Sequence, residues 1–176
     1  MKFIFFFLIS SFMIASGCSE TLKNNANKEH NSKEKSKEFY NLVHALNFAK
    51  VRKLPVLIHF SAYGCVNAIK MDQMIRENEK INSFIQENFV VATLYCDDRT
   101  PLPKNEIRFS EVCNGEIKTF GNKWSEMQIE NYNSFQQPLY VVIDYKGNDL
   151  TETFGYSSDI QSFKLFLSKG ISKFKK

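Results

Sequence analysis

The sequence predicts one α/β domain with a central mixed sheet flanked by helices. Two short apolar runs, 56–60 and 89–95, are typical of strands buried on both faces, and a helical pattern separates them. Two further strand patterns, 139–143 and 150–154, precede a closing amphipathic helix. This order indicates a parallel β-α-β unit followed by an antiparallel pair. The composition agrees, because 43% hydrophobic and 24% charged residues over 176 positions suit one globular domain plus a short extra segment.

Each element rests on a local pattern. The predicted elements are a helix from 39, strand 56–60, helix 65–78, helix 79–87, strand 89–95, helix 121–132, strands 139–143 and 150–154, and a helix from 160. Pro55 stops the first helix, and Gly64 separates the first strand from the helix that follows. The turn signal 146–148 favours a hairpin. Residues 99–120 match no regular pattern and are expected to be irregular.

The first 17 residues are typical of a signal sequence. Lys2 precedes an apolar stretch, which is too short for a membrane span of roughly 20 residues, and small residues follow from Ala15 to Gly17 before Cys18. The pattern resembles a bacterial lipoprotein signal, although Ala15 stands where such signals usually have leucine. The resemblance implies that 1–17 is removed and that Cys18 carries lipid, with the outer membrane and its periplasmic side as the default location. An uncleaved signal anchor, or an ordinary signal with a coincidental cysteine, is the alternative.

The segment 18–38 is predicted to be a flexible tether. It contains almost no apolar residues and therefore cannot bury enough surface to offset its ordering entropy. Lysines at the two ends of the chain supply much of the formal net charge of +4, and no concentrated basic patch is evident, which argues against nucleic acid as a partner. The expected organisation is therefore signal 1–17, lipidated cysteine and tether 18–38, and domain 39–176.

Four segments of the domain resemble one known family. They read FSAYGCVNAIKM (60–71), LYCDDRT (94–100), GNKWSEMQ (121–128) and QPLYVVID (137–144). In this order and spacing they resemble the thioredoxin-like domain at the C-terminus of DsbD-type thiol:disulfide interchange proteins, over about residues 39 to 170. The resemblance implies a thioredoxin-like fold and an envelope protein that acts on protein thiols or disulfides.

The resemblance assigns the nucleophile to Cys65, but the second cysteine of the family motif is replaced by Ala68. In a dithiol motif the first thiolate is favoured by the helix N-terminus, and the second thiol releases the product from the mixed disulfide. Ala68 cannot perform that release. The chemistry that this motif retains is formation of a mixed disulfide at Cys65, resolved by an external thiol or by another cysteine.

Cys96 and Cys113 are the internal candidates for the resolving thiol. Cys96 follows the second strand, whose end lies beside the first strand in this fold, and Cys113 lies in the irregular stretch. Alternatively, Cys96 is a small buried hydrophobic residue, and Cys113 is an incidental thiol or pairs with Cys96.

His59 stands where the resemblance places a buried acid that handles protons. It is either an acid or base near neutral pH or a core residue. Pro138 resembles a cis-proline that faces the cysteine motif and frees the preceding Gln137 backbone for an extended substrate. Tyr63 and Trp124 border the same groove in this interpretation, although core packing is the alternative for these aromatic residues.

Two classes of function remain after the sequence is read. The first is a lipid-anchored, monothiol thiol-disulfide oxidoreductase, and the second is a redox-inactive module that binds a client or partner protein. No metal-ligand set and no cofactor motif is found, and the adjacent acids Asp97 and Asp98 are read as a turn. The missing cysteine at Ala68 and the histidine at His59 favour an altered function.

Overall fold

The computed structural model describes residues 38–175, so the expected signal 1–17 and all but the last residue of the tether 18–38 lie outside the described residues. The elements in chain order are β1 (Glu38–Phe39), α2 (Leu42–Arg52), β2 (Val56–Ser61), α3 (Val66–Glu77), α4 (Glu79–Asn88), β3 (Val90–Tyr95), η1 (Lys104–Glu106), β4 (Arg108–Ser110), β5 (Gly115–Ile117), α5 (Phe120–Tyr132), β6 (Leu139–Ile143) and α6 (Ile160–Phe174). None of the helices described is long and apolar enough to cross a bilayer.

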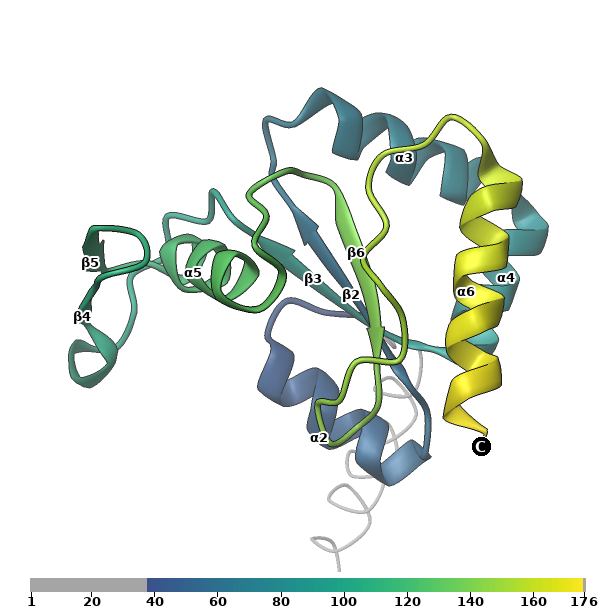
Figure 1. Cartoon of the computed structure of the whole chain (residues 1–176), viewed down its shortest axis with the longest axis horizontal. Coiled ribbons are helices and arrows are strands. Elements are labelled where there is room, and N and C mark those ends of the chain that lie inside the picture. The colour runs from purple at the N-terminus through teal and green to yellow at the C-terminus, as the bar shows by residue number, and fades with distance from the viewer. Residues whose placement is uncertain (1–37, 176) are drawn as a thin grey trace, which may run out of the picture. The chain divides into compact units, whose positions relative to one another are not determined.

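The main sheet has the strand order β1-β3-β2-β6 (Figure 1). β2 and β3 are parallel, with α3 and α4 forming the crossover between them, and β1 extends the sheet parallel to β3. β6 pairs antiparallel with the opposite side of β2. This topology confirms the expected mixed sheet flanked by helices.

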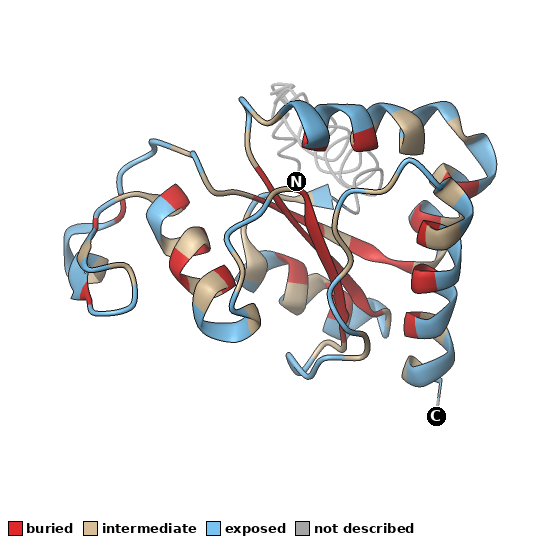
Figure 2. Ribbon diagram, turned by 45° about the horizontal axis from the view of Figure 1, so that its top comes forward, coloured by how far each residue is buried: buried red, intermediate tan, exposed pale blue. Residues whose placement is uncertain are grey.

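Both faces of the sheet are buried, because successive side chains of a strand point to opposite faces. Ile58 and Phe60 of β2 pack with α2 and α5, whereas Leu57 packs with α3, α4 and α6. Figure 2 shows buried residues along the strands and on parts of the helices. The two-sided burial explains why β2 is a nearly continuous apolar run in the sequence.

Side-chain caps determine where most helices begin. The capping residues are Asn41, Asn78, Thr119 and Asp159, at the starts of α2, α4, α5 and α6. The cap at Asn41 corrects the predicted start of the first helix, because Phe39 belongs to β1 and the helix begins at Leu42. α3 is different: Cys65 is its N-cap residue, and the Cys65 side chain makes no capping hydrogen bond.

The predicted hairpin at 139–154 forms only in part. β6 is a regular strand, but 149–154 joins it through two isolated bridges, Tyr140 with Phe154 and Ile143 with Asp149, rather than as a second strand. The Thr151 side chain accepts the hydrogen bond from the Val142 backbone N–H at 3.0 Å. The Thr151 side chain thus replaces a backbone carbonyl as the acceptor from β6, and the backbone pairing is interrupted at that position.

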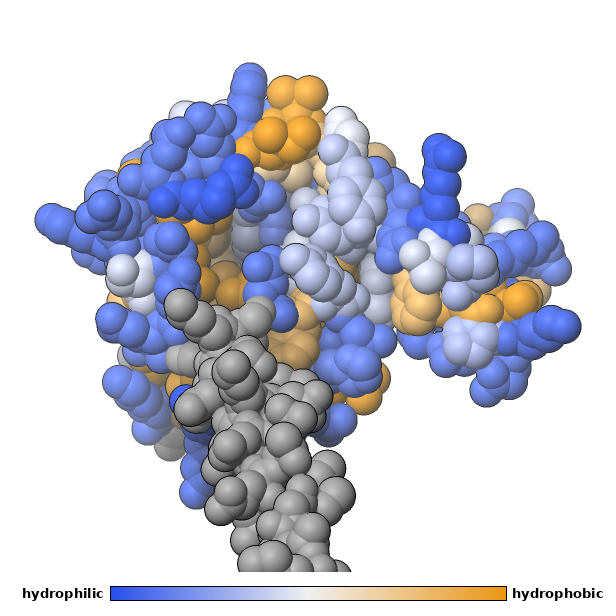
Figure 3. Space-filling view, turned by 180° about the vertical axis from the view of Figure 1, so that it is seen from behind, coloured by the Kyte–Doolittle hydropathy of each residue, from blue (hydrophilic) through white to orange (hydrophobic). Residues whose placement is uncertain are grey.

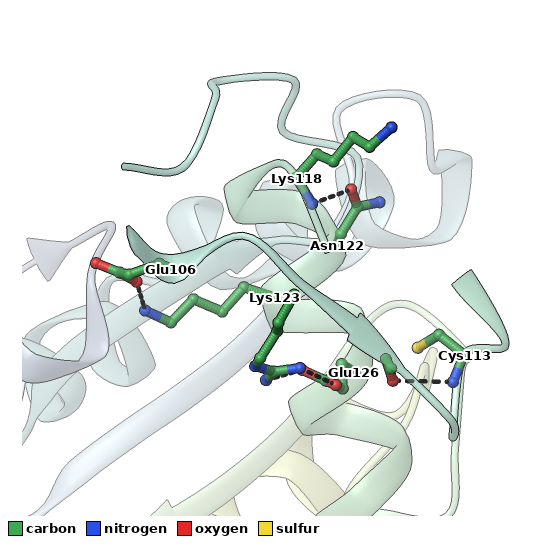
Figure 4. A network of polar contacts seen from close by, with 8 residues as sticks. Glu106, Cys113, Lys118, Asn122, Lys123 and Glu126 are labelled. Atoms are coloured by element: carbon green, nitrogen blue, oxygen red, sulfur yellow. Dashed lines mark hydrogen bonds and ion pairs between the residues drawn. The ribbon is translucent and has the colours of Figure 1, made fainter. Parts of the chain in front are cut away.

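Residues 99–119, which we term the arm, extend beside α5 (Figure 1). The arm was expected to be irregular, but it contains η1 and the antiparallel pair β4–β5. Two ion pairs fasten it to α5, between Arg108 and Glu126 and between Lys123 and Glu106, the second at 2.6 Å (Figure 4). The hydrogen bonds with Arg108 hold the pKa of the Glu126 carboxyl below its usual range.

Candidate active site

Cys65 lies in the turn between β2 and α3. Its backbone N–H donates to Ala62 O at 3.1 Å, and its carbonyl accepts the first α3 bond from Ile69 at 3.0 Å. The thiol is half-buried and stands at the N-terminus of α3, the positive end of the helix dipole. The sequence-predicted nucleophile is therefore a partly accessible thiol beside unpaired helix N–H groups.

The loop before β6 brings Gln137 and Pro138 to Cys65. The Cys65 thiol donates a hydrogen bond to the Gln137 carbonyl oxygen at 3.2 Å, across 72 positions of sequence. The Gln137–Pro138 peptide bond is cis, as the resemblance implies. Gly155 lies against this loop, because a Cβ built on it would be 2.4 Å from the side-chain nitrogen (Nε2) of Gln136.

Asp97 holds the backbone on the other side of Cys65. Its carboxylate accepts hydrogen bonds from the backbone N–H groups of Tyr63, at 3.0 Å, and Gly64, at 3.3 Å. Asp97 was not predicted as a site residue, because a pair of acids after a strand reads as a turn. Its position at the end of β3, beside the end of β2, is the signal that could have identified it.

Exposed apolar side chains surround Cys65. Tyr63 is 61% exposed and stacks on Tyr95, with ring centroids 3.9 Å apart. Val66 and Ile69 on the first turn of α3 are also exposed, and Figure 3 shows an apolar patch over the start of this helix at the top of the molecule. Trp124 is only 3% exposed and packs in the core, so the structure does not place it on the predicted groove.

His59 is buried below α3, on the sheet face opposite α2 and α5. Its ring stacks on Tyr140, with centroids 4.3 Å apart, and its Nδ1 atom lies 3.8 Å from the Asp72 carboxylate. Burial lowers the pKa of His59 to about 3, so the ring is neutral near pH 7 and this contact is not an ion pair there. The His59 Nε2 atom has no hydrogen-bond partner among the described residues.

Asp72 is a second residue that was absent from the predicted site. It accepts a hydrogen bond from the Tyr140 hydroxyl at 3.5 Å, and burial raises the pKa of its carboxyl to about 6. The spacing from Cys65 is the available signal, because seven positions are two turns of a helix and place both residues towards the same side. The group that titrates near neutral pH in this pair is therefore Asp72 rather than His59.

The two remaining described cysteines have different surroundings. Cys96 donates a hydrogen bond from its thiol to the Gln128 side-chain oxygen at 3.4 Å, and burial raises the pKa of the Cys96 thiol. Cys113 lies in the β4–β5 turn, where its backbone N–H donates to the Ser110 hydroxyl at 3.1 Å. Cys65, Cys96 and Cys113 are all free thiols in this structure.

Other described features lie away from this chemistry. No cluster of three or more His, Cys, Asp or Glu side chains that could hold a metal ion occurs among residues 38–175. A cavity of about 260 Å³ lies at the arm and is lined in part by Glu106, Arg108 and Lys123, which take part in the two ion pairs between the arm and α5. It does not include Cys65.

Comparison with known proteins identifies the fold. No family model matches the chain, and no curated protein matches it. A solved structure of a DsbH oxidoreductase is 18% identical, with a TM-score of 0.51, over 74% of this chain and 79% of that one. The solution structure of a thioredoxin from Thermus thermophilus is 17% identical, with a TM-score of 0.50, over 73% of this chain and 83% of that one. The chain therefore has the thioredoxin-like α/β fold, a mixed sheet flanked by helices.

Proposed function

We propose that this protein performs thiol–disulfide exchange on protein thiols or disulfides of the cell envelope, through Cys65, while lipid on Cys18 attaches it to a membrane. The observation that carries the proposal is the placement of a half-buried Cys65 thiol at the start of α3, 3.2 Å from the Gln137 carbonyl. Thiols at helix N-termini are suited to act as thiolates, which are the attacking species in exchange. The sequence resemblance to DsbD-type domains and the thioredoxin-like fold support the same chemistry.

The first step is a balanced exchange. The Cys65 thiolate attacks one sulfur of a substrate disulfide, a Cys65–substrate disulfide forms, and the other substrate sulfur leaves as a thiolate that takes a proton from water. When Cys65 gives up its thiol proton, the Gln137 carbonyl is released from its hydrogen bond. That carbonyl then accepts an N–H from an extended substrate segment. Exposed Tyr63 and Val66 provide apolar surface for side chains beside the substrate cysteine.

The second step needs a thiol from elsewhere. Ala68 is buried and carries no sulfur, so the mixed disulfide is released when another thiolate attacks the Cys65 sulfur. A disulfide between that thiol and Cys65 forms, the bond from Cys65 to the substrate breaks, and the substrate sulfur leaves as a thiolate that takes a proton from water. A further thiol then reduces the new disulfide and returns Cys65 to its free form. The motif at the start of α3 thus has a single thiol, Cys65.

A binding module without turnover is the second candidate function. It is favoured by the loss of the motif's second sulfur at Ala68 and by a neutral His59 where the family resemblance places an acid. In that function the surface around Cys65 holds a client protein, and the thiol is not required for binding.

The test uses the purified full chain and a peptide closed by one disulfide. We expect a mixed disulfide at Cys65, mapped by mass spectrometry in a Cys96→Ser background that removes an internal candidate for its resolution. It is lost when Cys65→Ser is added and retained when the matched control Cys113→Ser is added. The control removes a free thiol on the arm, away from the turn that carries Cys65. Equal peptide binding with and without Cys65, and no mixed disulfide in the Cys96→Ser background, establishes the binding module instead.

A further inference from the structure

Gln137 takes part in the hydrogen bonds around two free thiols, Cys65 and Cys96. Its carbonyl oxygen accepts the hydrogen bond from Cys65, and its side-chain amide donates to the Gln128 oxygen at 3.1 Å. The same Gln128 oxygen accepts the Cys96 thiol at 3.4 Å. Gln137 therefore contacts the Cys65 thiol through its backbone and, through its side chain, the same Gln128 oxygen that binds the Cys96 thiol.

The backbone joins the two cysteine turns as well. The Cys96 N–H donates to the Ser61 carbonyl at 2.8 Å, at the end of β2. The next residue, Asp97, binds the backbone of Tyr63 and Gly64, directly before Cys65. The turn that carries Cys96 and the turn that carries Cys65 are consequently one hydrogen-bonded unit.

Gln128 fixes the orientation on the Cys96 side. Its side chain is fully buried, and its amide nitrogen donates to the Gln136 carbonyl at 2.7 Å. With the nitrogen engaged, the Gln128 oxygen faces both Cys96 and Gln137. A buried amide with both ends bound holds its neighbours in place.

We propose that Cys96 is the thiol that resolves the mixed disulfide at Cys65, and that the Gln137 side chain separates the two sulfurs until it swings away. This inference rests on the exchange proposed for Cys65. Cys113 is not the resolving thiol, because it lies in the β4–β5 turn of an arm that Arg108 fastens to α5.

The resolving step balances in atoms and electrons. The Cys96 thiol loses its proton to water, its thiolate attacks the Cys65 sulfur, and a Cys65–Cys96 disulfide forms. The bond between Cys65 and the substrate breaks, and the substrate sulfur leaves as a thiolate that is then protonated. The substrate disulfide has gained two electrons, and the two cysteines have lost them. A dithiol reductant, either a protein or a small molecule, returns the pair to its reduced state.

The test uses the full chain with Cys18→Ser and Cys113→Ser, so that Cys65 and Cys96 are its remaining thiols. It reacts this chain with a disulfide reagent whose leaving group is coloured. One equivalent of dithiobis-nitrobenzoate is added, and released thionitrobenzoate and protein mass are measured together. We expect release of both reagent halves and a peptide cross-linked between Cys65 and Cys96. With Cys96→Ser added, one half is released, and the other stays on Cys65.

The outcomes separate the two proposals. If no adduct forms on Cys65 even in the Cys96→Ser chain, the exchange function itself fails. If the adduct forms and persists on Cys65 while Cys96 is present, only the resolving role of Cys96 is overturned. A Cys65–Cys113 disulfide in the chain that retains all three thiols also overturns it. Cys96→Ala repeats the measurement without a hydroxyl, so that a new hydrogen bond from serine does not decide the result.

A third variant tests the separating role of Gln137. Gln137→Ala keeps the backbone carbonyl and removes the amide. We expect closure of the Cys65–Cys96 disulfide to become about fivefold faster, as expected when a hydrogen bond of about 1 kcal/mol no longer has to break. Closure at the parental rate, or more slowly, overturns this part of the proposal.

Discussion

His59 and Asp72 respond to pH in opposite directions, because burial penalises the charged form of each. The pKa of His59 is lowered from 6.5 to about 3, so below pH 6.5 the unfolded chain binds a proton that the folded chain does not. The folded state therefore loses stability as the pH falls from 6.5 towards 3. The pKa of Asp72 is raised from 3.8 to about 6, so the folded state gains stability as the pH falls from 6 towards 3.8.

These opposite signs predict opposite behaviour of two variants. Glutamine at position 59 stays neutral at every pH, so the stability of His59→Gln relative to the parent should rise by about 1.4 kcal/mol per pH unit below 6.5. Asp72→Asn should show the reverse: any advantage over the parent at pH 7 shrinks as the pH falls through 6. Urea unfolding between pH 7 and pH 4.5 measures both differences. A stability difference for His59→Gln that is constant over this range shows that His59 accepts a proton in the folded protein.

At the scale of elements, the start of α5 supports the Cys65 turn. Gly121 donates its N–H to the Asp98 carbonyl at 2.9 Å, and a Cβ at position 121 would lie 2.6 Å from backbone atoms of Asp98 and 2.7 Å from the Cys96 carbonyl. A side chain at this position must displace the turn 96–98. Because Asp97 of this turn binds the backbone before Cys65, the displacement reaches the thiol.

Gly121→Ala should therefore be destabilising by about 1–3 kcal/mol, the usual effect of adding volume where no space exists. It should also change the alkylation rate of Cys65. The matched control is Gly115→Ala on the arm, where the nearest contact of a new Cβ is an ordinary 3.7 Å. Urea midpoints and iodoacetamide kinetics are measured for both variants. If Gly121→Ala is as stable as the control, the turn 96–98 is not held by close packing against α5.

The helices and the buried strands could be predicted from the sequence because their signals are local. Apolar periodicity placed β2 and α5 within one residue of their observed bounds. The arm could not be predicted in this way, since its order depends on Arg108 and Glu126, which belong to different elements. The interrupted strand at 150–154 depends on one Thr151 side chain that replaces a backbone acceptor.

The residues of the candidate site also differ in whether a local sequence signal identifies them. Cys65, Gln137 and Pro138 were identified because their segments resemble a known motif, and the sheet topology brings them together. Asp97 and Gln128 also lie in segments that resemble the family, but no role was predicted for either, because their contacts with Gly64 and Cys96 join residues 33 and 32 positions apart. Pairing at that distance follows from the packed fold rather than from any local pattern.

At the scale of the whole molecule, the proposed lipid on Cys18 decides which substrates Cys65 meets. Attachment to a membrane confines the domain to a thin layer, where the effective concentration of other membrane-attached proteins is high. Stable attachment by acyl chains requires more than one chain, which a cysteine with several acyl groups provides. The first described strand, β1, pairs with β3 at the edge of the sheet.

Removing the modified cysteine should therefore release the protein. We expect the parent chain to remain with membranes after a high-salt wash and to dissolve in detergent, whereas Cys18→Ser appears in the soluble fraction and takes up no labelled fatty acid. Cys113→Ser is the control, because it removes a thiol that lies within the described domain. A Cys18→Ser protein that stays in the membrane at full length identifies the apolar segment 3–15 as an uncleaved signal anchor instead. In that case Cys65 is still confined near the membrane, but by the peptide chain, and its reaction with a soluble disulfide peptide is unchanged.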